Sequence, residues 1–77
     1  MESKETVLDV RGTRCPIPVL KARKRMAGLP SDGLVTIISD DPLSQIDVPN
    51  FCREDGHVLM GTVPGKDGAV SFCIQKG

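Results

Sequence analysis

Two prolines separated by one residue, Pro16 and Pro18, constrain the fold of this chain more than any other feature of its sequence. Proline has no backbone N–H and clashes with the preceding helical turn, so a helix tolerates it in its first turn but not deeper. Apolar residues then recur at steps of three and four, at Val19, Ala22, Met26 and Leu29. This spacing predicts a helix that begins at the prolines, buries one stripe and ends near residues 28–33.

The remaining segments predict the order β-α-β-α-β-β. Residues 7–10 form a short strand candidate that turns at Gly12, and residues 34–38 are rich in β-branched side chains. Residues 58–63 and 69–74 are two further strand candidates, and the glycine-containing segment 64–68 between them suits a hairpin loop.

A second helix is expected between Pro42 and Gly56, with Gly56 as its C-terminal cap. Because Pro49 should lie in a first turn, we expect the regular helix to start near Asp47, which is an acceptable N-cap. Residues 43–46 would then form a turn. The side chains expected to face inward are Ile46, Phe51 and Cys52.

The fold class that these elements define is α/β (α+β), in one domain spanning residues 1–77. We expect a two-layer α/β sandwich in which both helices cover one face of a four-stranded mixed sheet. The chain has 77 residues, no Trp and no Tyr, so its core must be small and aliphatic. So small a core can hardly enclose a substrate pocket, and chemistry should therefore occur at the surface.

The charges are segregated along the chain although the formal net charge is zero. Residues 11–25 contain basic side chains and no acid, whereas the charged side chains of residues 32–55 are mainly acidic. This pattern predicts a dipole that can steer an acidic partner; an ordinary solvated helix face is the alternative. The residues that we expect to dock partners are Arg11, Lys21, Arg23, Lys24 and Arg25.

Cys15 is the candidate nucleophile. Pro16 disfavours a helical backbone at Cys15, so we expect Cys15 to be the N-cap and Pro16 the first helical residue. The positive end of the helix, Arg14 beside the thiol and Arg11 nearby should all favour the thiolate. No His or Asp adjacent in sequence can act as a general base, so a Cys-His hydrolase is disfavoured.

The other candidate groups have ordinary structural interpretations. Cys52 and Cys73 are expected to be inert core residues, and His57 to serve a capping or surface role. The three cysteines form no paired motif, so we expect neither disulfides nor a metal site. The charged N-terminus is followed by no long apolar stretch, which favours a cytoplasmic protein that does not enter a membrane.

Several motifs together resemble the TusA/SirA-like sulfur-carrier family over nearly the whole chain. They are Leu8-Asp9 with Gly12, Cys15-Pro16-Ile17-Pro18-Val19, Asp41-Pro42, Asp47-Val48-Pro49-Asn50-Phe51-Cys52 and Gly56-His57. The resemblance implies a two-layer fold similar to the C-terminal domain of a bacterial translation initiation factor. It also implies that Cys15 is the persulfide site. From their positions beside the thiol, we expect Gly12, Arg14, Pro16 and Pro18 to support it.

The resemblance further implies a carrier without cofactor that is loaded by a cysteine desulfurase or a rhodanese-like enzyme and passes sulfur to a protein thiol. We expect a monomer. Members tied to tRNA thiolation typically carry an acid where this chain has Ile17. Sulfur oxidation, molybdenum-cofactor supply and selenium handling are therefore equally open, and tRNA would be involved only indirectly.

Two other interpretations remain open from the residues. The basic helix could contact RNA, although few aromatics and no net charge argue against strong binding. Cys15 could instead act in thiol redox chemistry, for which it would need glutathione because no resolving cysteine is nearby.

Overall fold

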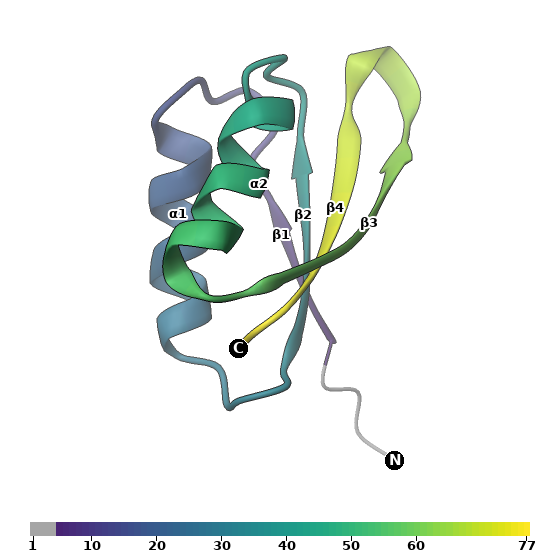
Figure 1. Ribbon diagram of the computed structural model, residues 1–77. Helices are drawn as coiled ribbons and strands as arrows, with labels where there is room; N and C mark the ends of the chain where they lie inside the picture. The colour runs from purple at the N-terminus through teal and green to yellow at the C-terminus, as the bar shows by residue number, and fades with distance from the viewer. Residues whose placement is uncertain (1–4) are drawn as a thin grey trace.

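The structure is a computed structural model that describes residues 5–77, and it confirms the predicted β-α-β-α-β-β order (Figure 1). Its principal elements are β1 (Glu5–Asp9), α1 (Ile17–Ala27), β2 (Leu34–Ser39), α2 (Ser44–Asp55), β3 (Val58–Pro64) and β4 (Val70–Gln75). The first four residues of the charged N-terminus, on which the localisation prediction partly rests, lie outside the described residues.

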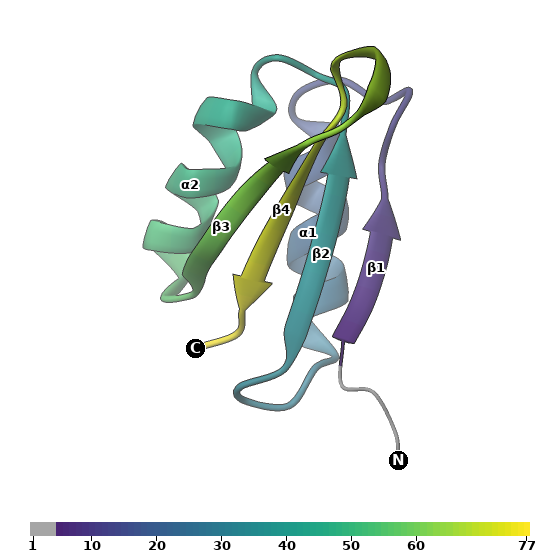
Figure 2. The same cartoon turned by 90° about the vertical axis from the view of Figure 1, so that its right-hand side faces the viewer.

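The four strands form one mixed sheet in the order β1-β2-β4-β3. β1 pairs with β2 in parallel, whereas β4 pairs antiparallel with both β2 and β3. Both helices cover the same face of this sheet, and Figure 2 shows the opposite face, which neither helix covers. The two-layer sandwich expected from the sequence is therefore confirmed.

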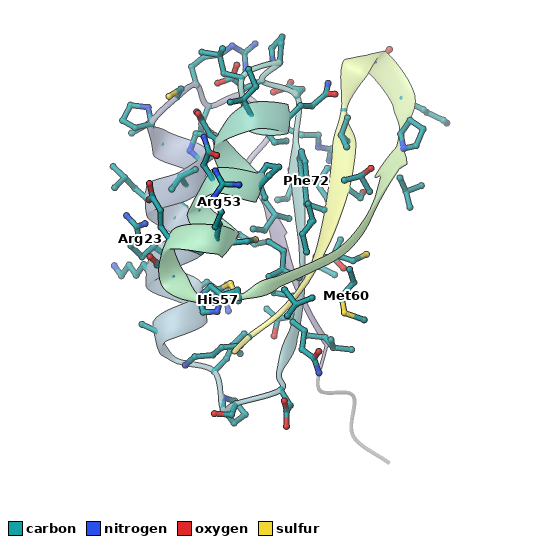
Figure 3. The ribbon with its side chains drawn as sticks, viewed as in Figure 1. Arg23, Arg53, His57, Met60 and Phe72 are labelled. Atoms are coloured by element: carbon teal, nitrogen blue, oxygen red, sulfur yellow. The ribbon has the colours of Figure 1, made fainter. Side chains whose placement is uncertain are left out.

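The core lies between the sheet and the helices and is mainly aliphatic. Phe72 projects from β4 toward the helices, whereas Met60 projects from β3 on the side away from them (Figure 3). Met60 occupies an irregularity in the pairing of β3 with β4 and is 59% exposed. The buried core residues are Val10, Ala22, Met26, Val35, Ile37, Val48, Phe51, Cys52, Phe72 and Ile74.

The start of α1 differs from the prediction. The N-cap is Pro16, not Cys15, and no side chain caps this end. The N–H of Ile17 donates to the carbonyl of Arg14 at 2.8 Å, so Cys15 and Pro16 form the corner of a turn that precedes the helix. The peptide bond between Cys15 and Pro16 is cis. The helix nevertheless buries the predicted stripe, since Ala22 and Met26 are fully enclosed.

The start of α2 was also predicted wrongly. The helix begins at Ser44, because the carbonyl of Leu43 already accepts the N–H of Asp47 at 2.8 Å. Pro49 therefore lies inside the helix, where its missing N–H costs one hydrogen bond. Ile46, expected to face inward, is 61% exposed.

The buried face of α2 is formed by Ser44, Val48, Phe51 and Cys52, which recur at helical spacing. The helix ends as predicted at Gly56, whose φ of 78° lies in the left-handed region that glycine adopts without strain.

Candidate functional site

The loop that carries Cys15 lies where the parallel strands β1 and β2 both end. Their carboxyl ends meet at one edge of the sheet, so residues following β1 come next to residues following β2. The N–H of Cys15 donates to Oδ2 of Asp41 at 2.6 Å, and the N–H of Gly12 donates to Oδ1 of Asp40 at 3.0 Å. Two adjacent carboxylates thus hold the backbone on either side of Arg14.

Asp41 is anchored firmly enough to act as a tether. Its carboxylate also accepts the N–H of Leu43 at 3.1 Å, and its own N–H donates to Oγ of Ser39 at 3.2 Å. Ser39 in turn hydrogen-bonds Ser44 at 2.7 Å, and both serines are buried. Asp41 is only 5% exposed, so this polar network fixes the position of Cys15 from beneath.

The thiol of Cys15 is exposed and faces acidic groups from other elements. A hydrogen bond to the carboxylate of Asp47 is the largest cause of a raised pKa of the Cys15 thiol. Partial removal from water and the negative charges of Asp47 and Asp41 act in the same direction. The expectation that the surroundings favour the thiolate is therefore wrong.

The neighbouring arginines do not offset these acids, because each has its own partner. Arg14 donates to Asp40 at 3.0 Å, and Arg11 contacts Asp9 through hydrogen bonds of 2.7 and 2.9 Å. The N–H of Ile17 is occupied by a carbonyl. At the thiol, the positive potential of the α1 N-terminus and of the two arginines is therefore outweighed by the neighbouring acids.

A shallow groove of about 260 Å³ runs from Cys15 between α1 and α2. The residues that line it are Cys15, Pro16, Val19, Arg23, Asp47, Asn50, Phe51 and Glu54.

Arg23, which lines this groove from α1, joins the two helices (Figure 3). Its guanidinium forms two hydrogen bonds to Asp55, at 2.8 and 3.1 Å, and lies 5.3 Å from the centre of the Phe51 ring. Glu54 is 3.7 Å away. These pairs between the basic and acidic segments weaken the charge separation that the sequence suggests.

The other predicted docking residues fall into two groups. Arg11 and Arg23 are held by ion pairs, as described above. Lys21, Lys24 and Arg25 instead line an open hollow between α1 and Leu8 of β1. We call these three residues the basic face.

The remaining thiols and His57 lie away from the groove's reactive end. Cys52 is buried, and burial followed by the charge of Asp55 raises its pKa to about 11. Cys73 is half-buried on the other side of β4 from Phe72, with its sulfur 3.9 Å from Oγ1 of Thr36. The His57 ring packs 5.4 Å from Phe51, and its Nδ1 accepts the N–H of Gly77.

The acids around Cys15 are functional candidates that sequence reasoning missed. From sequence alone, Asp41 is interpreted only as part of a family motif, and Asp47 only as a helix cap and part of another family motif. The parallel pairing of the first two strands was the available signal, because it brings the segments after both strands together.

In residues 5–77, no group of three or more His, Cys, Asp or Glu side chains is arranged to hold a metal ion. Within the same residues, neither helix has the length and apolar character that crossing a membrane requires.

Fold and site together define a small α+β thiol protein whose single exposed cysteine is displayed at one end of a two-layer sandwich. The family model described as sulfurtransferase TusA matches residues 6–76. The chain belongs to this family.

Individual relatives agree with this assignment. The chain is 34% identical over 76 residues to the sulfur carrier protein TusA of Buchnera aphidicola, covering 99% of this chain and 95% of the relative. It is 35% identical over 69 residues to TusA of Pseudomonas syringae, covering 90% and 81%. A crystal structure of a SirA-like protein from Desulfitobacterium hafniense superposes with a TM-score of 0.82 at 27% identity, covering 94% of this chain and 97% of the other.

Proposed function

We propose that this protein is a sulfur carrier that holds sulfur as a persulfide on Cys15 and passes it to a protein thiol. The observation that carries the proposal is the exposure of Cys15 on a loop tethered by Asp41, in a chain of the TusA family. A carrier must present its sulfur to two partners in turn, which an exposed and positionally fixed thiol can do.

The proposed cycle consists of two exchanges. The thiolate of Cys15 attacks the outer sulfur of a donor persulfide; a new S–S bond forms on Cys15, the donor's S–S bond breaks, and the donor leaves as a thiolate that takes up a proton. A thiolate of the acceptor then attacks the outer sulfur on Cys15; an S–S bond forms on the acceptor, the S–S bond on Cys15 breaks, and Cys15 leaves as a thiolate that takes up a proton. No net oxidation or reduction occurs, so the cycle needs no cofactor.

Partner proteins would dock beside Cys15 along α1. Ile17, Leu20, Lys21 and Lys24 recur at helical spacing, and the two apolar residues are 40% and 51% exposed. We propose that this stripe, continued by Arg25, receives an acidic partner surface with an apolar centre. The donor would be a cysteine desulfurase or a rhodanese-like enzyme, and the carrier would act as a monomer in the cytoplasm.

The experiment that tests the proposal is loading followed by intact-mass measurement. The wild-type protein incubated with a cysteine desulfurase and cysteine should gain the mass of one sulfur atom. Cys15→Ser should gain none, whereas the matched Cys73→Ser variant should load like the wild type. Undiminished loading of Cys15→Ser would refute the proposal.

A further inference from the structure

The groove that contains the Cys15 thiol also contains an acidic side chain from α2, Asp47, to which the proposed cycle gives no role. Asp47 lies on α2 and lines the same groove as Cys15, and its carboxylate raises the pKa of the Cys15 thiol. It is half-buried, whereas its neighbour Ile46 is exposed. A carboxylate near the sulfur of a carrier slows nucleophilic attack by that sulfur, because it disfavours formation of the thiolate.

Among the described residues, the cations near Cys15 are paired with acids other than Asp47. The loop before α1 supplies Arg14, but Asp40 binds it. The acidic loop after β2 supplies Asp41, whose oxygens accept backbone N–H groups. Along the groove, Arg23 from α1 is shared by the neighbouring acids Glu54 and Asp55 of α2.

We propose that Asp47 controls the protonation of the sulfur that Cys15 carries, so that the loaded carrier stays neutral and electrophilic until an acceptor thiolate attacks it. This proposal rests on the proposed function, since it concerns the persulfide on Cys15. The outer sulfur lies one S–S bond, about 2 Å, beyond the Cys15 sulfur. It therefore remains close to the carboxylate in the loaded form.

The chemical reason concerns the second exchange. A neutral persulfide accepts an attacking nucleophile at its outer sulfur, whereas a persulfide anion repels one and is itself a nucleophile. Persulfides are stronger acids than thiols. The persulfide of the loaded carrier would therefore ionise readily unless a neighbouring group favoured its neutral form. A carboxylate that accepts a hydrogen bond from S–H stabilises the neutral form. On transfer, the Cys15 sulfur leaves as a thiolate and recovers its proton.

The first test compares Asp47→Asn with the wild type in the unloaded state. The rate of Cys15 alkylation by iodoacetamide is followed by peptide mass spectrometry across about pH 5 to 10. Asp47→Asn should shift the profile to lower pH and speed alkylation at pH 7 by at least about twofold. Asp47→Glu should stay near the wild type because it keeps the charge. Asp32→Asn, at the opposite end of α1, should leave the profile unchanged.

The second test uses the loaded state and an uncharged phosphine, which removes the outer sulfur as a phosphine sulfide and returns the Cys15 thiol. Since this probe carries no charge, it senses the electrophilicity of the persulfide without repulsion by the acids. Asp47→Asn should move the loss of phosphine reactivity to lower pH and slow extraction at pH 7 by at least about twofold.

Equal profiles for Asp47→Asn and wild type in either test, or a shift to higher pH, would overturn the inference. An equal effect of Asp32→Asn would also overturn it, because the shift would then come from the net charge of the protein and not from the position of Asp47. Failure of the wild type to load would instead refute the proposed function, and the alkylation test would still decide the role of Asp47 at the thiol.

Discussion

Replacing Asp41 by asparagine should loosen the loop that carries Cys15. In the wild type one carboxylate oxygen accepts the N–H of Cys15 at 2.6 Å and the other accepts the N–H of Leu43 at 3.1 Å. Asparagine keeps one acceptor and turns an NH₂ group toward the other N–H. Because hydrogen bonds to charged groups contribute about 1.5–3 kcal/mol, we expect the free energy of unfolding to fall by about 2 kcal/mol.

Urea unfolding followed by far-UV circular dichroism measures this loss, since the chain has no Trp or Tyr for fluorescence. For a domain of this size the same loss corresponds to a decrease in Tm of about 8–16 °C. Amide hydrogen exchange should show faster exchange at Cys15. Asp32→Asn is the matched control, because Asp32 is exposed with φ of 68°, a conformation that asparagine tolerates. Unchanged stability and unchanged Cys15 protection in Asp41→Asn would refute the tether.

Three further changes probe other parts of the structure. Phe51→Ala should lower the free energy of unfolding by about 3–5 kcal/mol in urea titrations, because the side chain is 1% exposed. In Arg23→Gln, the free energy of unfolding should decrease less than in the wild type as the pH is lowered. Arg23 holds the pKa of Asp55 below its ordinary value, so the ion pair stabilises the fold above about pH 4 and stabilises it less at lower pH. With iodoacetamide, Cys15 should react in the folded protein, whereas Cys52, buried with a pKa of about 11, should react only after unfolding.

Each of these expectations can fail clearly. A loss below about 1 kcal/mol for Phe51→Ala would mean that the core closes around the missing ring. Parallel pH curves for Arg23→Gln and wild type would show that the ion pair with Asp55 is absent in solution. Alkylation of Cys52 at the rate of Cys15 in native protein would contradict its burial.

The arrangement of elements could be predicted because it depends on local patterns. The helical stripe containing Ala22 and Met26 and the left-handed cap at Gly56 are encoded within a few residues, and the structure confirms them. The first residues of the helices were harder to predict, because tertiary contacts there outweigh the local sequence pattern. Pro49 argued for a late start of α2, but the turn stabilised by Asp41 starts it earlier and leaves the proline inside.

The environment of Cys15 could not be inferred from its sequence neighbours. Arg11 and Arg14 suggested an activated thiolate, yet folding pairs them with carboxylates and places Asp47, 32 positions away along the chain, in the same groove as the thiol. Electrostatics at a site depend on distances through space, which composition along the chain does not contain.

The most direct test of the central claim locates the sulfur after loading. Wild-type protein loaded by a desulfurase is trapped with an alkylating agent, digested and sequenced by mass spectrometry before and after addition of an acceptor thiol protein. We expect one extra sulfur on the peptide containing Cys15, which disappears when the acceptor is added. Extra sulfur on Cys52 or Cys73, or sulfur on Cys15 that the acceptor cannot remove, would contradict it.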